Sequence, residues 1–421
     1  MKVFNIIYIS GILFTTVSAY SNFMLRMIHD KSTLPSAKLI EYPKLNYKDL
    51  TEQTKFDLQW YVIGKKGDFL KNRPKKVQVW NTNYVVWRNE NNSYVALDDV
   101  CPHKGASLSA GKICDNNIVC PYHGYEFNEE GTLTKVPGIC FKPVKDLIRP
   151  ADSHSSWSMT DKEINPSPEE ADLNLYRFKP SSVYDVKKYN IIEKNGWVYL
   201  NTQYVNDVND VNVTASSIYT EPEIEDGCAV VHLDMEYNCY SRILSENSLD
   251  IMHIAFVHTF GNKARPNPTK EIPPRLVGPN HYKSTYYYES GDDSIAKKVF
   301  GVKDLIIENE FILPHTTIAR VKFGDQVSTV ITFALPLGDK KSRLFVKTYR
   351  NFWDNQLGYA ITKNSMYNTM LQDKLVVESI DPRFMDGKFN MKFDKLQNTY
   401  TSFYKRFIHQ FHEVDPSNRE L

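Results

Sequence analysis

The chain has 421 residues, which is more than a single hydrophobic core usually organises, so two or three domains are expected. Its 51 lysines and arginines balance its 50 aspartates and glutamates, which argues against binding nucleic acid through a broad basic surface. With 42% hydrophobic and 24% charged residues the chain can bury a sizeable core, and six cysteines in this length exclude a disulfide-rich scaffold.

The N-terminal residues have the layout of a secretory signal. Lys2 provides a positive start, residues 3–13 are mostly apolar, and residues 17–19 are small enough for a cleavage site. The basic, hydroxylated stretch that follows is similar to the second part of the address used by algae with complex plastids. We therefore interpret residues 1–56 as a targeting leader and N-terminal arm. The plastid is the expected destination, and the endomembrane or secretory route is the alternative.

Residues 57–205 have the pattern of an all-β domain. Short aromatic and β-branched runs alternate with turns rich in Gly, Pro and Asn, and these runs predict strands at residues 60–64, 75–89, 93–100, 125–138 and 187–203. The polar stretch 150–174 predicts a loop insertion. Residues 206–214 repeat Asn-Asp-Val without an apolar face, which indicates a linker between domains.

Residues 215–421 alternate between strand and helix patterns. The second domain is therefore expected to be α+β, an antiparallel sheet with helices. Strands are predicted at residues 308–337 and 342–353, and helices are predicted over residues 242–258, 367–379 and 399–414.

Two short motifs in the β-rich region each place one cysteine and one histidine on a loop. The first is Cys101-Pro-His103 and the second is Cys120-Pro-Tyr-His123. Two thiolates on one iron and two imidazoles on the other are the ligands of a mixed [2Fe-2S] centre, whose potential is higher than that of an all-cysteine cluster. Zinc also accepts two Cys and two His, but zinc-finger spacing pairs Cys with Cys and His with His. The spacing therefore favours the iron–sulfur cluster.

These residues resemble the C-x-H and C-x-x-H motifs of the Rieske family, and the resemblance extends from about residue 60 to residue 203. Gly105 and Gly124 permit the tight turns that such loops need. Respiratory Rieske proteins have one further Cys in each loop, and the corresponding residues here are Ala106 and Tyr122. The resemblance therefore favours the oxygenase or ferredoxin branch. The other four cysteines have no ligand spacing and are expected to be buried thiols.

A second set of possible metal ligands is spaced as Glu246-x3-Asp250-x2-His253-x4-His258. Two imidazoles and one carboxylate on one face of an iron leave positions open for oxygen and substrate. His253 and His258 are five residues apart, which on an ideal helix is about 140° of rotation. Both can reach one metal only if the helix ends or distorts between them, and Gly261 is consistent with a helix end nearby.

After the cluster motif, this segment resembles the iron motif of Rieske-type non-haem iron oxygenases. The resemblance implies His253 and His258 as iron ligands and Asp250 as the acid that links a cluster His to an iron His. The third ligand is expected on a late helix at residues 372–379, where Asp373 is the prediction. Glu378 and Asp381 are the alternatives.

Within that family, the layout and the Q-D-x-x-V-V-E-S segment at 372–379 resemble the pheophorbide a and chlorophyllide a oxygenase group of plastids. The pheophorbide branch implies a C-terminal apolar anchor preceded by C-x-x-C, whereas this sequence ends FHEVDPSNREL, which leaves open a peripheral association with a membrane. A chlorophyll-type tetrapyrrole is the expected apolar ring substrate. A sterol-type desaturase or hydroxylase of the same superfamily is the alternative.

The resemblance implies an oxidoreductase with a [2Fe-2S] cluster and a mononuclear Fe(II). Electrons are expected from a ferredoxin or flavoprotein reductase, and they pass from His103 or His123 through Asp250 to the iron, where O2 is used. In the family the cluster of one subunit serves the iron of its neighbour, which implies a homotrimer. The rival from another class is a Rieske electron-transfer protein without oxygenase activity. It would leave more than 200 residues, with His253, His258 and Asp373 among them, without a role.

Overall fold

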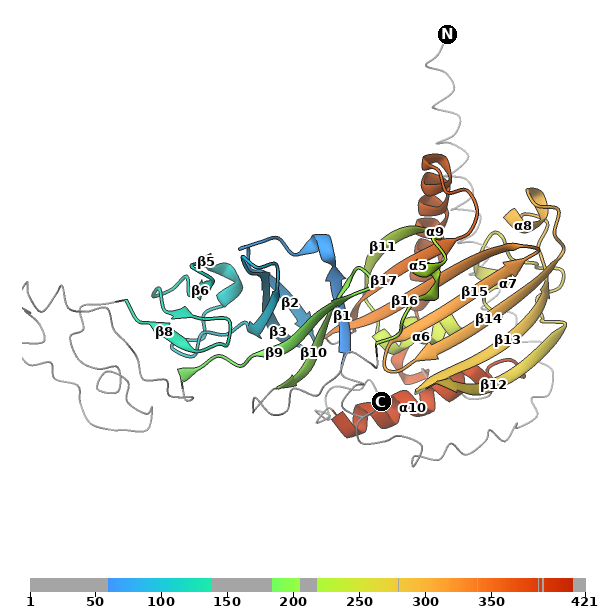
Figure 1. Ribbon diagram of the computed structural model, residues 1–421. Helices are drawn as coiled ribbons and strands as arrows, with labels where there is room; N and C mark the ends of the chain where they lie inside the picture. The colour runs from blue at the N-terminus through green and yellow to red at the C-terminus, as the bar shows by residue number, and fades with distance from the viewer. Residues whose placement is uncertain are drawn as a thin grey trace, which may run out of the picture. The chain divides into compact units, whose positions relative to one another are not determined.

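The structure is a computed structural model that describes residues 60–137, 184–204, 218–278, 280–338, 340–384, 386–387 and 390–411 (Figure 1). The predicted leader, loop insertion and linker lie outside the described residues, so these assignments and the domain boundaries stay predictions. Among the described helices, none combines the length and the apolar character that crossing a membrane requires.

The first described part consists of short antiparallel strands in three small sheets (Figure 1). The strands are β1 (Trp60–Lys65), β2 (Lys75–Val79), β3 (Thr82–Arg88), β4 (Tyr94–Asp98), β5 (Lys112–Cys114), β6 (Asn117–Val119), β7 (Glu126–Phe127), β8 (Leu133–Lys135), β9 (Tyr189–Lys194) and β10 (Trp197–Tyr204). One sheet has the order β1-β10-β9, a second has β2-β3-β4, and the third has β5-β6-β7-β8. Asn92, Asn195 and Gly196 have positive φ in hairpin turns, which Asn and Gly tolerate best. The predicted all-β domain is confirmed.

The second part is a seven-stranded antiparallel sheet with helices, in the order β11-β17-β16-β15-β14-β13-β12. Its strands are β11 (Ala229–Tyr237), β12 (Lys270–Gly278), β13 (His281–Glu289), β14 (Asp304–Ile312), β15 (Thr316–Phe323), β16 (Gln326–Gly338) and β17 (Lys341–Arg350). Its helices are α5 (Pro222–Glu225), α6 (Ser241–Leu249), α7 (Ile254–Val257), α8 (Ile295–Lys298), α9 (Gln356–Val377) and α10 (Lys395–Phe411). The predicted α+β class is confirmed.

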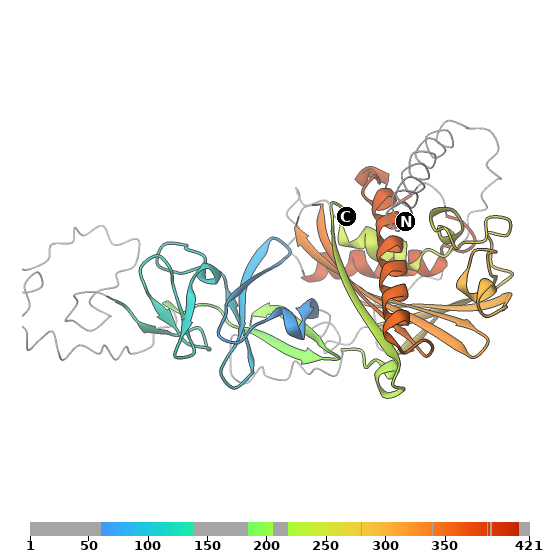
Figure 2. The ribbon, with the colours of Figure 1, turned by 90° about the horizontal axis from the view of Figure 1, so that it is seen from above.

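The two faces of the large sheet pack against different partners. On one face, α6, α9 and α10 cover the strands (Figure 2), and the Phe311 ring lies 5.4 Å from the Tyr400 ring of α10. On the other face, the Phe333 and Phe345 rings lie 5.5 Å and 5.7 Å from the Trp197 ring of β10. Successive residues of a strand point to opposite faces, so a single sheet supports both the helices and the β1-β10-β9 sheet.

The helix predicted over residues 242–258 is not continuous, and that prediction is wrong in this respect. α6 ends at Leu249, and α7 begins only at Ile254. Asp250 adopts an extended conformation with ψ 117°, and its carboxylate accepts a hydrogen bond from the backbone N–H of Met252 at 2.7 Å. A side chain that bonds to its own neighbouring backbone competes with the helix, which explains the break.

The helix predicted at 367–379 begins earlier than expected, at Gln356. Its start is set by Asn355, whose side-chain oxygen accepts a hydrogen bond from the backbone N–H of Gly358 at 2.8 Å. Because the cap is a single polar residue and the exposed turns that follow have no apolar periodicity, this start is hard to recognise from sequence. The helix predicted at 399–414 is observed over its described residues as α10, which begins earlier, at Lys395.

A buried ion pair links the large sheet to the hairpin between β9 and β10. Lys347 Nζ donates to Glu221 Oε2 at 2.6 Å and to the backbone oxygen of Asn195 at 2.7 Å. Tyr349 donates its hydroxyl to the same carboxylate at 2.5 Å. The Lys347 and Glu221 side chains are each 1% exposed. Such a pair contributes little net stability when intact, but the loss of one partner leaves a buried charge without compensation.

We therefore expect Lys347→Met to lower the free energy of unfolding by about 3–5 kcal/mol, because Glu221 would stay buried without its cation. Urea denaturation measures this change. The matched control is Lys341→Met on the same strand, whose ion pair with Glu236 is half exposed on both sides and whose loss should cost less than about 1 kcal/mol. Equal losses in the two variants would contradict the assignment.

Candidate metal centres

Two loops with the same backbone hydrogen bonds present the first four predicted ligands. In the loop after β4, the N–H of Cys101 donates to the carbonyl of Ala106 at 2.8 Å, and Gly105 donates back to the carbonyl of Cys101 at 2.8 Å. In the loop between β6 and β7, Cys120 and Gly124 make the equivalent bonds. Both glycines have φ +73°, and a Cβ on Gly124 would lie 2.8 Å from Pro137. The two loops are therefore matched turns that place one Cys and one His each.

The four side chains divide into an inner sulfur pair and an outer imidazole pair. Cys101 and Cys120 are 1% and 2% exposed, whereas His103 and His123 are exposed with ring centroids 4.6 Å apart. Burial raises the pKa of Cys101 to about 11, so the protein alone does not keep this sulfur ionised. A bound metal would do so. The residues thus fit a cluster with two sulfurs on one iron and two imidazoles on the other.

Two tyrosines that were not expected to contact the ligands lie against the exposed imidazoles. The Tyr125 ring is stacked on His103 at 4.6 Å, and the Tyr122 ring is tilted against His123 at 3.8 Å. Tyr122 also occupies one of the two positions where a respiratory Rieske protein has a cysteine. Of the other cysteines, Cys239 is buried, but Cys114 and Cys228 are only half-buried, so the expectation of buried thiols is too strong. Cys140 lies outside the described residues.

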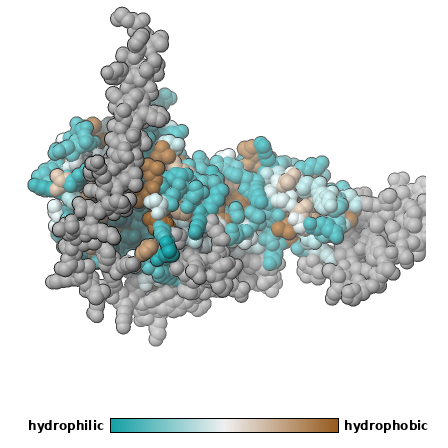
Figure 3. All heavy atoms as spheres, turned by 180° about the vertical axis from the view of Figure 1, so that it is seen from behind, coloured by the Kyte–Doolittle hydropathy of each residue, from teal (hydrophilic) through white to brown (hydrophobic). Residues whose placement is uncertain are grey.

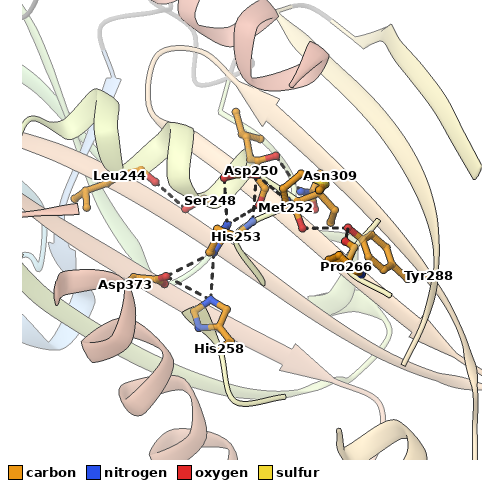
Figure 4. Close-up of polar contacts among 12 residues, drawn as sticks. Leu244, Ser248, Asp250, Met252, His253, His258, Pro266, Tyr288, Asn309 and Asp373 are labelled. Carbon is orange, nitrogen blue, oxygen red and sulfur yellow. Dashed lines mark hydrogen bonds and ion pairs between the residues drawn. The ribbon is translucent and has the colours of Figure 1, made fainter. Parts of the chain in front are cut away.

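His253, His258 and Asp373 come together in the second domain, and Figure 4 shows them facing one another. The two Nε2 atoms are 3.2 Å apart, and Asp373 Oδ1 lies 3.6 Å from that of His253 and 3.3 Å from that of His258. Atoms about 2.1 Å from one ion at roughly 90–110° are about 3.0–3.4 Å apart. Asp373 Oδ1 is buried without a hydrogen-bond donor. The group therefore has the spacing and the free acceptor that a mononuclear metal requires.

The ring of His253 is oriented by Asp250, but through the backbone. Its Nδ1 lies 2.7 Å from the carbonyl oxygen of Asp250 and 3.8 Å from the carboxylate. A proton on Nδ1 leaves Nε2 free to bind a metal. Burial lowers the pKa of His253 to about 4, and so the imidazole is neutral near pH 7. The predicted role of Asp250, a link between a cluster His and an iron His, stays a prediction.

His258 is held by a residue that the sequence did not single out. Its Nδ1 lies 3.0 Å from the side-chain oxygen of Gln372, and its ring is stacked on Phe260 at 5.0 Å. Only one signal in the sequence could have indicated Gln372, which is its position directly before the expected ligand Asp373.

Three contacts with the end of β11 fix the part of α9 that contains Gln372 and Asp373. Tyr237 donates its hydroxyl to the carbonyl of Met370 at 3.2 Å, and Lys374 donates to the carbonyl of Glu236 at 2.6 Å. The carboxylate of Glu378 accepts from the backbone N–H of Asn238 at 2.7 Å. Glu378 is therefore engaged elsewhere.

The remaining acidic candidates also lie outside the metal group. The carboxylate of Asp381 forms an ion pair with Arg383 at 2.5 Å. Glu246 is buried against Arg242, with Oε1 2.7 Å from the guanidinium. Neither belongs to the group of His253, His258 and Asp373, in which Asp373 is the carboxylate.

A tyrosine of the sheet fixes the loops on both sides of the two histidines (Figure 4). The hydroxyl of Tyr288 lies 3.2 Å from the carbonyl of Ile251 and 3.1 Å from the carbonyl of Pro266. Asn309 of β14 also approaches the carbonyl of Leu249, at 3.5 Å. The sheet therefore supports the segment that contains His253 and His258 through side chains of β13 and β14.

The comparisons with known proteins agree with this architecture. Residues 59–145 match the Rieske [2Fe-2S] domain. The chain is 34% identical over 87 residues to the oxygenase component of 3-ketosteroid-9-alpha-monooxygenase from Rhodococcus rhodochrous, over 21% of this chain and 23% of that protein. It is 25% identical over 312 residues to the chloroplastic pheophorbide a oxygenase of Oryza sativa subsp. japonica, over 70% of this chain and 49% of that protein.

The matched parts therefore span about half or less of these two relatives. Among solved structures, dicamba monooxygenase with non-heme iron and dicamba is similar with a TM-score of 0.61. That match has 16% identity and covers 84% of this chain and 98% of that one. The likeness confirms the predicted order of folds, a Rieske domain followed by an α+β domain with an antiparallel sheet.

Removal of the Asp373 carboxylate should affect the mononuclear metal and leave the cluster intact. We expect Asp373→Ala to lower the iron content from about three to about two per chain and to leave the visible spectrum of the cluster unchanged, because the cluster ligands lie on other loops. Iron analysis and absorption spectroscopy measure both. Asp381→Ala is the control, since this acid follows the same helix but pairs with Arg383. Similar iron contents in the two variants would rule out Asp373 as a ligand.

Proposed function

From a Rieske [2Fe-2S] domain and the fold of the Rieske oxygenases, we propose that this chain is a Rieske-type non-haem iron oxygenase. The observation that supports this function best is the group of His253, His258 and Asp373, whose ligand atoms lie 3.2–3.6 Å apart. A Rieske electron carrier would have no use for such a group. When bound, the cluster supplies single electrons and the mononuclear iron activates O2.

The residues of this chain contribute binding, orientation and access. The exposed imidazoles of His103 and His123 offer a surface where a ferredoxin or flavoprotein reductase can deliver electrons. The carbonyl of Asp250 keeps the proton of His253 on Nδ1, so that Nε2 faces Asp373 and the metal position. The half-buried carboxylate of Asp250 is the proposed link to a cluster imidazole.

The surroundings of the second site favour an apolar substrate. The Phe260 ring, 38% exposed, is stacked on the ligand candidate His258 at 5.0 Å, and Phe256, 49% exposed, lies on the short helix between the two histidines. On the face shown in Figure 3, apolar residues gather in small patches on a surface that is otherwise mostly hydrophilic. We propose a chlorophyll-type tetrapyrrole as substrate, in line with the similarity to pheophorbide a oxygenase. A steroid is the second candidate, in line with the 3-ketosteroid enzyme.

Oxygen consumption by the reduced protein tests this proposal. We expect substrate-dependent O2 uptake with pheophorbide a or chlorophyllide a, and less with a 3-ketosteroid, when a ferredoxin and its reductase supply electrons. His253→Ala should abolish the uptake while the cluster is still reduced and reoxidised, as its electron-spin spectrum reports. Normal cluster reduction in the wild-type protein with no uptake on any ring substrate and no third iron would favour the electron carrier.

The assembly and the location complete the proposal. We propose a homotrimer in which the cluster of one subunit serves the iron of its neighbour, a plastid location in line with the chloroplastic relative, and peripheral contact with a membrane. Sedimentation of the active protein is expected to give a trimer. A fully active monomer would contradict electron transfer between subunits.

A further inference from the structure

We propose that Gln372 is a positioning residue that fixes the tautomer and the ring orientation of the metal ligand His258. The proposal rests on the mononuclear metal centre described above and adds a residue to it. It starts from one contact, the 3.0 Å approach of Gln372 Oε1 to His258 Nδ1.

The positions of the two ring nitrogens decide which one must have the proton. His258 Nε2 lies 3.3 Å from Asp373 Oδ1 and 3.2 Å from His253 Nε2, so this nitrogen faces the metal position. A metal binds the lone pair of a neutral imidazole, and the proton must then be on Nδ1. Nδ1 is therefore a donor, and the side-chain oxygen of Gln372 is the acceptor at the correct distance.

The two histidines differ in what holds them. Nδ1 of His253 donates to the backbone carbonyl of Asp250 at 2.7 Å, and no side-chain substitution removes that acceptor. Nδ1 of His258 depends on a side chain, and the ring is otherwise confined by stacking on Phe260. The His258 side chain is 4% exposed, so water is a poor replacement for a lost acceptor. The orientation of His258 is consequently the adjustable part of the site.

The chemistry of an amide also suits the charge of the site. Gln372 accepts the hydrogen bond from Nδ1–H without adding charge, so Asp373 is the one anionic ligand beside two neutral imidazoles. A glutamate at position 372 would still accept the hydrogen bond, but it would place a second carboxylate next to the first. It would also make the imidazole a stronger ligand. The side chain at 372 can therefore change the metal affinity without itself contacting the metal.

Gln372 and Asp373 are consecutive residues on one firmly placed helix segment. The contacts of Met370, Lys374 and Glu378 with the end of β11 bracket them at intervals of four residues. Any movement of α9 would thus displace the anionic ligand and the partner of His258 together.

Metal titration of the cluster-containing protein tests the proposal. Co(II), which has visible bands that depend on its ligands, is added to protein freed of mononuclear iron, and the affinity is compared among variants. We expect Gln372→Leu to weaken binding by roughly 10–100-fold and to alter the Co(II) spectrum. Gln372→Glu, which keeps an acceptor, should retain tight binding. Asn368→Leu, an exposed position one turn earlier on α9, is the control and should bind as the wild type does.

Gln372→Asn gives a second, independent measurement because its shorter amide cannot reach Nδ1 although it remains polar. It decides the matter if the leucine variant fails to fold, which loss of the cluster absorbance would report. Wild-type affinity in either Gln372→Leu or Gln372→Asn would overturn the proposal, and so would equal weakening in Gln372→Glu. A wild-type protein that binds no Co(II) or Fe(II) at this site would instead contradict the proposed oxygenase.

Discussion

The proposed mononuclear site depends on two breaks in the helix around its histidines, at Asp250 and after Val257. In a continuous helix His253 and His258 would point about 140° apart, and a carboxylate on α9 could meet only one of them. Two breaks in the helix avoid this: Asp250 ends α6, its carboxylate accepting from Met252 N–H and its carbonyl from His253 Nδ1, both at 2.7 Å, and α7 ends at Val257, where His258 is extended with ψ 142°. Asp250 therefore orients the first imidazole, and the end of α7 turns the second, so that both rings face Asp373 of α9.

The large sheet provides the rigid support for the turn at Asp250. A turn of four residues has few contacts of its own, and here Tyr288 and Asn309 reach its carbonyl groups from two neighbouring strands. The opposite face of the same sheet packs on Trp197, and the buried pair of Lys347 and Glu221 adds a polar contact with the β9–β10 hairpin. The seven hydrogen-bonded strands of this one sheet thus contact the segment with the two histidines on one face and β10 on the other.

What could be predicted from sequence was determined by local spacing. Cys101 and His103 are two residues apart, and His253 and His258 are five apart. A metal needs several ligands close together, and such short spacings can be recognised in the sequence. The support for these ligands comes from far along the chain: 114 residues separate His258 from Gln372. No periodicity reports such a pair. The helix breaks illustrate the intermediate case: the spacing called for a helix end between His253 and His258, which α7 provides after Val257, but it did not indicate the further break at Asp250.

The two proposed centres differ in the solvent exposure of their histidines, and this difference is consistent with their proposed tasks. The proposed cluster ligands are divided, with buried sulfurs at Cys101 and Cys120 and exposed imidazoles at His103 and His123. In the proposed function, an exposed imidazole edge shortens the path for an electron from the donor protein. At the second site burial instead lowers the pKa of His253 to about 4. The resulting neutral ring can donate from Nδ1 and leaves Nε2 free to bind a metal.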